Sequence, residues 1–488
     1  MDAKIQGDRS PLTPPESGVV MPGFKWPLRL SERKTLLAIG DFVLVNGAVL
    51  LALWIWTLRD PHRRFSWTFI LSQAHWFLIL TALWFLSASL NDFYNLRLAA
   101  GLRSIWLALF RITALVFLIY VALYFLSPPQ SLPRGIILYH CVATFGLVGI
   151  WRMAYAALLS RPPFRRRAIV IGAGQAGQTI VRAIQENLPS EYHLVGYIDD
   201  DPDKRGKIIE GIPVIGIWRD LLSLVEQENI SEIILAITHT AHGELIRAIM
   251  DCQEQGIQIS FMPLLYEEIT GRVPVEHIGD AWSLVLPLDH AAIGSFWPFF
   301  KRTMDILISG IGLIILALLF PILALAIYID SPGPIFYTQE RVGKGGRVFR
   351  IFKFRSMIPN AEENGAIWAQ ENDPRVTRVG RFLRRTMIDE LPQFINVLRG
   401  EMSIVGPRPE RPIFAEQLAK QIPFYRARHA VKPGMAGWAL INYGYSSSVR
   451  DALVKLQYDL YYIKHQSLAL DLFILLKTIG AMLSFRGR

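Results

Sequence analysis

Four long, predominantly apolar segments fill most of the first third of the chain. They lie at residues 35–58, 68–90, 104–126 and 135–158. A helix needs about 20 predominantly apolar residues to cross the hydrocarbon core of a bilayer, and each segment is long enough. Hydrophobic residues make up 52% of the chain and charged residues only 19%, which is low for a water-soluble protein. The sequence therefore predicts a membrane protein whose residues 31–160 form four transmembrane helices.

The charges of the loops predict how this bundle is oriented. Basic residues precede the first segment, separate the second from the third and follow the fourth, where Arg165, Arg166 and Arg167 stand together. Cytoplasmic loops carry the excess of Lys and Arg, so we expect both ends of the bundle in the cytoplasm. Arginines between the first two segments run against this bias. Arg111 and Arg152 fall inside segments, and the sequence assigns them no role.

The remaining composition restricts the classes of partner. The formal net charge of +10 suits anionic lipids and phosphate-bearing ligands. Nucleic acid is not expected, because the positive charge lies beside apolar segments. Cys141 and Cys252 are too few for a disulfide framework or a zinc site. Residues 1–30 are polar and rich in proline, and we expect them to form a disordered tail.

Residues 161–295 carry the pattern of an α/β domain. Short apolar runs predict strands at residues 168–171, 194–198, 233–237 and 257–261. The loop after the first strand leads into a predicted helix and holds the glycines of a dinucleotide-binding fingerprint, Gly172, Gly174 and Gly177. Asp199 follows the second strand at about the offset of an acid that binds a ribose. We expect a cytoplasmic Rossmann-like domain, with nucleotide binding and a purely structural role both open.

An acid pair, Asp389 and Glu390, is the candidate centre of the last part of the chain. The apolar residues that follow recur at the spacing of one helix face, and Gly400 is a natural end for that helix. The pair should therefore lie in a first helical turn, where the helix dipole is expected to keep carboxylates ionised. An ionised carboxylate serves as a nucleophile or a metal ligand. The alternative is that the pair only caps the helix.

The surroundings of the acid pair are strongly basic. Lys353 and Arg355 share one face of a predicted strand, because side chains alternate with a period of two. A run of arginines that includes Arg384 precedes the pair, and Arg408 follows it in a loop rich in proline. Acids surrounded by cations predict a site for phosphates bridged by a divalent metal, with a solvated charged surface as the alternative.

The order of these motifs resembles a known enzyme family. The chain is similar to the bacterial sugar transferases over residues 298–488, through FKFRSM, DPRVTRVGRFLRRTMIDELPQFINVLRGEMSIVGPRPERP and KPGMAGWA. The resemblance implies a catalytic domain at residues 296–488 in a protein of the bacterial inner membrane. It implies transfer of a hexose 1-phosphate from a UDP-sugar, with UDP-glucose first and UDP-galactose next, to undecaprenyl phosphate. UMP would be released, and the product would initiate a polysaccharide repeat unit.

The same resemblance implies roles for individual residues. Asp389 would be the nucleophile that forms a phosphosugar–aspartate intermediate, and Glu390 would help it to hold Mg²⁺. Lys353, Arg384 and Arg408 match phosphate-binding positions, and Arg355 is expected to join them. Membrane lipids are the other expected partners, and a homodimer is left open.

A fifth apolar segment, residues 303–330, is expected to dip into the membrane without crossing it. Pro321 in this segment removes a backbone hydrogen bond and bends the helix, and basic residues flank both ends. A spanning helix, which is the alternative, would carry the catalytic segment to the outside, where UDP-sugars are absent. The predicted fold class is thus a membrane protein of α and α/β parts, with a mainly α catalytic domain and a Pro-kinked re-entrant helix.

Two other function classes are kept as alternatives. A membrane-anchored, NAD-dependent nucleotide-sugar dehydratase would need a Tyr-x-x-x-Lys pair, and the sequence contains none. A non-enzymatic membrane scaffold or sensor that acts through the Rossmann-like domain would leave the cluster of acids and cations without an explanation.

Overall fold

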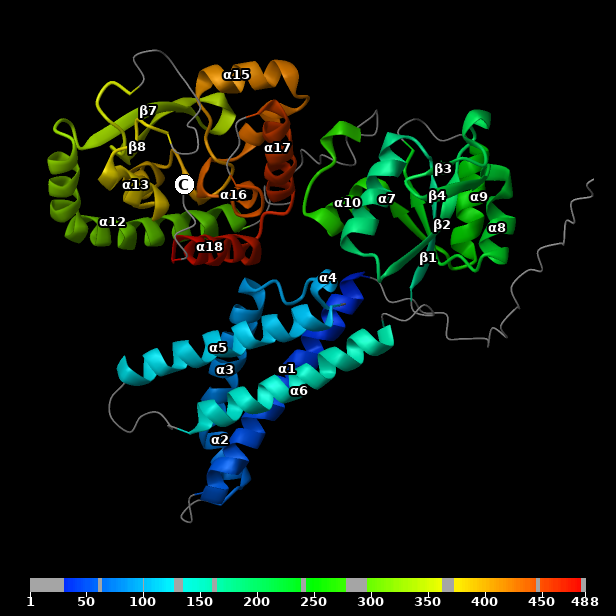
Figure 1. Ribbon diagram of the computed structural model, residues 1–488, viewed down its shortest axis with the longest axis horizontal. Coiled ribbons are helices and arrows are strands. Elements are labelled where there is room, and N and C mark those ends of the chain that lie inside the picture. Colours follow the sequence, from blue (N-terminus) through cyan, green and yellow to red (C-terminus); the bar gives the residue numbers. More distant parts are fainter. Residues whose placement is uncertain are drawn as a thin grey trace, which may run out of the picture.

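The computed structural model describes nine stretches of the chain. They are residues 30–59, 64–99, 101–126, 135–159, 165–237, 243–277, 296–361, 373–444 and 448–483. The expected disordered tail lies outside the described residues except for Leu30, which begins the first helix. Figure 1 shows three bodies, with a bundle of long helices lying below an α/β domain and a C-terminal domain.

The helical bundle contains the apolar segments that the sequence predicts. Its helices are α1 (Leu30–Arg59), α2 (Trp67–Ser72), α3 (Ala74–Leu90), α4 (Leu96–Ala99), α5 (Leu102–Leu126) and α6 (Ile136–Leu159). By length and composition α1, α5 and α6 are candidate membrane spans. The second predicted segment is broken at Gln73 into α2 and α3, and α3 has only 17 residues. The apolar helices are confirmed, while their orientation in the membrane stays a prediction.

Arg152, to which the sequence assigns no role, forms a buried ion pair inside the bundle. Its guanidinium on α6 donates to the Asp41 carboxylate on α1, with an Nε–Oδ1 distance of 3.3 Å, and to the carbonyl of Phe93 at 3.1 Å. Charged groups within a membrane bundle are costly unless they pair with one another or with backbone carbonyls. Arg152 therefore holds α6, α1 and the segment after α3 together.

The α/β domain is a six-stranded sheet with strand order β3-β4-β2-β1-β5-β6. The strands are β1 (Arg166–Ile171), β2 (Tyr192–Ile198), β3 (Ile208–Ile209), β4 (Ile212–Gly216), β5 (Glu232–Leu235) and β6 (Gln258–Phe261). The helices are α7 (Gln175–Asn187), α8 (Leu221–Gln227), α9 (Gly243–Glu254) and α10 (Met262–Thr270). Neighbouring strands are parallel except β3 and β4. The predicted Rossmann-like domain and its four strands are confirmed, and β3 and β4 were not predicted.

Successive residues of β1 enter two different apolar cores. Ala168 and Val170 pack with α7 and α10, whereas Ile169 and Ile171 pack with α8 and α9. Side chains of a strand point alternately to the two faces of its sheet. The sheet is therefore covered by helices on both faces, which explains why β1 reads as a continuous apolar run.

The glycines of the fingerprint differ in what the protein requires of them. Gly172 has a φ of +101°, which favours glycine. A Cβ at Gly177 would lie 1.9 Å from the carbonyl oxygen of Gly172, so α7 can approach the loop only without a side chain there. A Cβ at Gly174 would meet nothing within 4 Å. Backbone conformation thus explains why glycine stands at position 172, and packing explains why it stands at position 177. Neither explains the glycine at position 174.

The C-terminal domain is mainly helical, as predicted, and holds two small sheets. Its helices are α12 (Trp297–Asp330), α13 (Arg378–Arg385), α14 (Phe394–Arg399), α15 (Pro412–Gln421), α16 (Trp438–Asn442), α17 (Val449–Lys464) and α18 (Leu468–Leu483). The strands β7 (Phe336–Val342) and β8 (Val348–Phe354) form an antiparallel hairpin, and β9 (Ser403–Val405) pairs in parallel with β10 (Gly434–Ala436). A 3₁₀ segment, η6 (Ile388–Gln393), joins α13 to α14.

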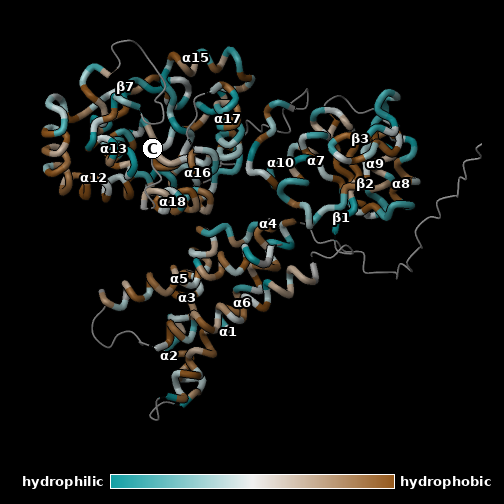
Figure 2. Tube along the Cα trace, in the orientation of Figure 1, coloured by the Kyte–Doolittle hydropathy of each residue, from teal (hydrophilic) through white to brown (hydrophobic). Residues whose placement is uncertain are grey.

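The helix α12 presents a continuous apolar surface. It is apolar and long enough to span a membrane, and only 11% of its most apolar 18-residue stretch is buried. Figure 1 shows that it changes direction near its C-terminal end, and Pro321 lies in that part of the helix. In Figure 2 the hydrophobic colour follows α12 and α18 along one border of the domain. The predicted proline bend is present, and whether α12 dips into the membrane stays a prediction.

Both ends of α12 are bonded to the same C-terminal domain. Near its start, Lys301 donates to the Asp471 carboxylate of α18 at 2.6 Å, and Arg302 donates to the carbonyl of Val397 at 2.7 Å. At its end, Asp330 accepts the backbone N–H of Val379 at 2.8 Å. The helix is therefore bonded to the C-terminal domain at both of its ends.

We predict that Gly177→Ala destabilises the protein and that Gly174→Ala does not. The added methyl group would overlap the Gly172 carbonyl in the first variant, and overpacking of this kind costs about 1–3 kcal/mol. In the second variant the space is open and the backbone φ of −76° suits alanine. Thermal unfolding of the full chain in detergent measures both. Equal losses in the two variants would contradict the packing described for this loop.

Candidate active site

The predicted acid pair begins the short helical segment η6. Asp389 and Glu390 lie in its first turn, and the chain continues as α14 until Gly400, whose φ is +81°. A left-handed glycine of this kind commonly ends a helix, so the predicted end is confirmed. The first turns are 3₁₀ rather than α. η6 packs on β8 and on α12, which places the acids between the hairpin and the apolar helix.

Glu390 is held by two cations from different parts of the chain. Lys353 on β8 donates to its Oε1 at 2.8 Å. Arg408, in the loop after β9, donates through Nη1 to Oε2 at 3.1 Å and through Nη2 to Oε1. Charge-assisted bonds of this type are roughly twice as strong as neutral ones. Three segments that are distant in sequence are thereby fixed around one carboxylate.

Asp389 has a different environment from its neighbour. Its side chain is only 7% exposed, and within the described residues no group donates a hydrogen bond to it. Lys353 and Arg384 are close enough to interact with it electrostatically. Arg384 in the last turn of α13 also makes no hydrogen bond or ion pair within the described part of the chain. Within the described residues, a carboxylate and a guanidinium without hydrogen-bond partners thus interact electrostatically.

The two carboxyl groups have opposite pKa shifts. Burial raises the pKa of Asp389 to about 6, because the nearby cations only partly offset the loss of water. Burial also acts against ionisation of Glu390, yet Arg408 and Lys353 outweigh it and hold the pKa of Glu390 well below its ordinary value. The helix dipole therefore does not keep the pKa of Asp389 low, although a carboxyl group with a pKa of about 6 is still mostly ionised at neutral pH. Contacts with cations, rather than the dipole, account for the difference between the two pKa values.

Arg355 does not join the predicted cluster. It is buried at the end of α12, where its guanidinium donates to the backbone carbonyl of Ser331. The argument from strand alternation fails because β8 ends at Phe354, one residue earlier. In the preceding arginine run, Arg375 is committed to Asp373, and Arg381 and Arg385 are exposed. Of the predicted cations, Lys353, Arg384 and Arg408 are brought to the acid pair.

Two further residues position this site, and no local pattern in the sequence indicates either of them. The amide of Asn396 on α14 donates to the carbonyl of Arg350 at 2.7 Å and accepts the N–H of Phe352 at 3.0 Å, which fixes β8 beside η6. Arg428 donates to the carbonyl of Arg408 at 3.0 Å and to the Asp459 carboxylate at 2.7 Å. Both are long-range contacts between residues that no local pattern relates.

The donor set is compatible with Mg²⁺ held jointly by protein and substrate. Within the described residues no group of three or more His, Cys, Asp and Glu side chains could hold a metal ion by itself. Mg²⁺ is commonly bound by one or two carboxylates together with substrate phosphates. Asp389 offers a carboxylate without other partners, while both oxygens of Glu390 already accept from Lys353 and Arg408.

Residues of the fingerprint region of the α/β domain already form hydrogen bonds within that domain. The carboxylate of Asp199 accepts the N–H of Ala173 at 2.7 Å and an ammonium hydrogen of Lys204 at 3.1 Å. One loop amide that could face a pyrophosphate is thereby already bonded. The structure leaves nucleotide binding at Gly172, Gly174, Gly177 and Asp199 a prediction.

Family models and relatives match this architecture. The model described as "Bacterial sugar transferase" matches residues 296–485, and that described as "CoA-binding domain" matches residues 89–263. A "UDP-galactose-lipid carrier transferase" of Erwinia amylovora is 30% identical over 377 residues, which cover 73% of this chain and 76% of the relative. The chain belongs to the bacterial sugar transferase family.

Other relatives of this chain carry names that differ in the sugar. A "UDP-N-acetylgalactosamine-undecaprenyl-phosphate N-acetylgalactosaminephosphotransferase" of Aeromonas hydrophila is 44% identical over 250 residues, 50% of this chain and 57% of the relative. A "UDP-glucose:undecaprenyl-phosphate glucose-1-phosphate transferase" of Xanthomonas campestris pv. campestris is 32% identical over 317 residues, 64% of this chain and 66% of the relative. The chain thus spans little more than half of the Aeromonas relative's length.

We predict that Asp389→Asn stabilises the metal-free protein at neutral pH. The raised pKa means that the folded wild type binds more protons than the unfolded chain between about pH 4 and pH 6, so its stability falls as the pH rises through that range. An asparagine side chain does not bind a proton in this range, so the variant loses no stability in this way. The advantage of the variant should grow by roughly 1–2 kcal/mol between about pH 4.5 and about pH 7.5. Thermal unfolding with a chelator present measures it, and a difference that does not change with pH would contradict the shift.

Proposed function

We propose that the sugar transferase moves a sugar 1-phosphate from a UDP-sugar to undecaprenyl phosphate and releases UMP. The observation that carries the proposal is the buried carboxylate of Asp389, which has no hydrogen bond from the described residues and lies beside Lys353 and Arg384. A desolvated carboxylate among cations suits attack on a phosphate whose negative charge would otherwise repel it. The relatives named above support the substrate class.

In the first step an oxygen of Asp389 attacks the phosphorus that bears the sugar. The bond from this phosphorus to the bridging oxygen breaks, and UMP departs with that oxygen. A sugar-phosphoryl aspartate is left. In the second step a phosphate oxygen of undecaprenyl phosphate attacks the same phosphorus, the bond to Asp389 breaks, and the carboxylate is regenerated. No net proton transfer is needed.

The cations of the site neutralise the phosphates during both steps. Arg384 is available to bind a phosphate oxygen because it has no partner in the described part of the chain. Lys353 and Arg408 are fixed by Glu390, so their charges stay in place without reorganisation. Asp389 would hold Mg²⁺ together with the substrate, and the ion would supply further neutralisation of the phosphate charge. Glu390 would act chiefly through the cations it holds.

The transferred sugar is proposed to be one of those named in the relatives. UDP-glucose and UDP-galactose are the donors expected from the sequence, and the Aeromonas relative adds UDP-N-acetylgalactosamine. Release of UMP from each donor, measured with undecaprenyl phosphate present, identifies the substrate.

We further propose that α12 enters the membrane from the cytoplasmic side and returns to it. Both ends of α12 are bonded to one domain, at Lys301 and at Asp330, which does not suit a helix that crosses a bilayer. Its exposed apolar side chains, such as Leu318 and Ile322, need a non-aqueous surrounding. The acid pair would then lie near the headgroups, where the phosphate of a polyprenyl lipid is found.

We predict that Asp389→Asn abolishes transfer and that Arg384→Ala reduces kcat/KM for the UDP-sugar by about ten- to a hundredfold, the loss expected for one charge-assisted contact. An amide cannot form the acyl phosphate at a useful rate. UMP release by purified protein in Mg²⁺ buffer measures both, with Arg381→Ala as the matched control on the same helix. Substantial transfer by Asp389→Asn would exclude the two-step route.

The membrane arrangement is tested by single cysteines in a variant that lacks Cys141 and Cys252. Lys344→Cys, beyond the end of α12, should resist an impermeant thiol reagent in intact cells and react after permeabilisation. Ser66→Cys, between α1 and α2, should react from outside in both cases. External labelling at position 344 would show that α12 crosses the membrane.

A further inference from the structure

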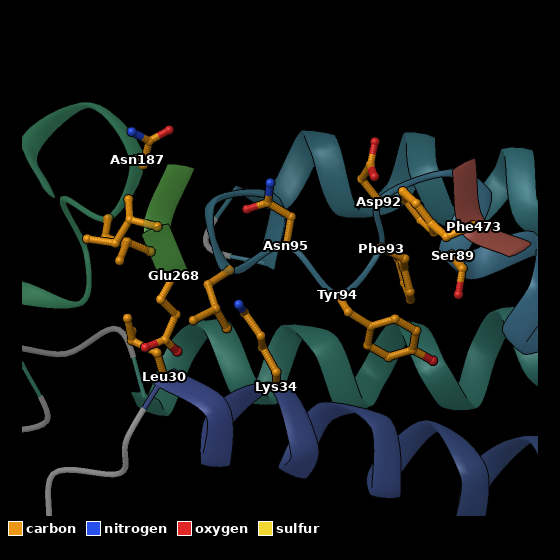
Figure 3. Close-up of a pocket in the computed structure, with 13 residues that line it drawn as sticks. Leu30, Lys34, Ser89, Asp92, Phe93, Tyr94, Asn95, Asn187, Glu268 and Phe473 are labelled. Carbon is orange, nitrogen blue, oxygen red and sulfur yellow. The ribbon is translucent and has the colours of Figure 1, made fainter. Parts of the chain in front are cut away.

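A cavity lies where the three bodies of the protein meet, away from the acid pair. Its volume is about 330 Å³. Figure 3 shows its walls, which come from α1, from the segment after α3, from the end of α7, from α10 and from α18. None of the residues proposed for sugar transfer lines it.

Ion pairs between the bodies fix the walls of this cavity. Arg33 on α1 is paired with Glu191 of the α/β domain, and both are buried. Lys477 on α18 donates to Asp92, after α3, at 2.6 Å. Lys464 on α17 donates to Glu267 on α10 at 2.9 Å, which joins the remaining two bodies. The cavity therefore depends on the docking of all three bodies, and the ion pairs around it hold its walls in place.

Two opposite charges in the cavity have no partner among the described residues. Lys34 extends from α1 and Glu268 from α10, and Figure 3 shows both at the same end of the cavity. Lys34 is half-buried and Glu268 is exposed, and within the described residues neither side chain makes a hydrogen bond or an ion pair. A ligand that carries both a negative and a positive group would satisfy both residues at once.

Besides polar residues such as Asn95 and Asn187, the lining includes apolar side chains, and the cavity lies where a membrane helix begins. Leu30, Leu188 and Phe473 contribute apolar surface to the cavity. Leu30 and Lys34 stand in the first turns of α1, which continues as a candidate membrane span. The cavity is therefore at the boundary between polar and apolar surroundings, the level at which the headgroups of amphiphiles lie.

We propose that this cavity binds a zwitterionic aminophospholipid, with its phosphate on Lys34 and its ammonium group on Glu268. An anionic lipid, a polyprenyl phosphate or a nucleotide diphosphate would place negative charge beside Glu268 with Lys34 to compensate, because Lys477 is already paired with Asp92. The apolar lining contacts the first part of the acyl chains. Because the ligand binds only the docked arrangement, it stabilises the contact of the catalytic domain with the bundle.

The test uses the full chain in detergent micelles, titrated with phosphatidylethanolamine while the midpoint of thermal unfolding is followed. We expect a saturable rise for the wild type. In Lys34→Gln and in Glu268→Gln the lipid concentration at half of the rise should increase about ten- to a hundredfold, the loss expected for one charge-assisted bond. Lys34→Arg should retain binding. Lys207→Gln and Glu244→Gln, which alter exposed charges elsewhere on the α/β domain, are the controls and should behave as wild type.

Further arms of the titration identify the ligand. Phosphatidylglycerol should raise the midpoint less than phosphatidylethanolamine, and soluble glycerophosphoethanolamine should bind more weakly because it lacks acyl chains. The proposal is overturned if Lys34→Gln and Glu268→Gln leave the phosphatidylethanolamine curve unchanged. Equal effects of the anionic lipid would overturn the zwitterionic assignment, and equal binding of the soluble headgroup would overturn the assignment to a lipid.

Discussion

The ion cluster around Glu390 is the interaction on which the catalytic domain depends. It joins η6 to β8 through Lys353 and to the loop after β9 through Arg408. A buried charge must be paired, and removal of one partner of such a pair is strongly destabilising. Because both cations are committed to Glu390, they cannot also neutralise Asp389 completely. The cluster therefore creates the unusual state of its neighbour, a buried carboxyl group whose pKa is raised to about 6.

The second constraint is the position of α12 beneath the acid pair. One side of this helix packs on η6, α13 and α14, and the other is exposed and apolar. In the proposed arrangement the polyprenyl chain of the acceptor stays in the membrane while its phosphate reaches the site from the level of the headgroups. In this arrangement α12 both anchors the catalytic domain in the membrane and packs against the segment that holds the acid pair.

Local patterns in the sequence were sufficient for a large part of this architecture. The apolar segments, the strand and glycine pattern of the α/β domain and the helix that ends at Gly400 all follow from the period and the type of neighbouring residues. Motifs in a fixed order predicted the family, which the relatives confirm. Gln73, which interrupts the second apolar segment, shows the limit of such patterns, because hydropathy alone does not reveal where a helix breaks.

What the sequence could not predict depends on contacts between distant residues. Arg355 stands two positions from Lys353 but turns to Ser331, because the strand has already ended. The difference between two adjacent carboxyl groups arises from Lys353 and Arg408, which come from either side of them in the chain. The most direct test of Asp389 as the nucleophile is mass spectrometry of the protein quenched with its UDP-sugar in the absence of undecaprenyl phosphate. A sugar-phosphate adduct on the peptide that contains Asp389 is predicted, whereas an unmodified protein that still catalyses transfer would contradict covalent catalysis.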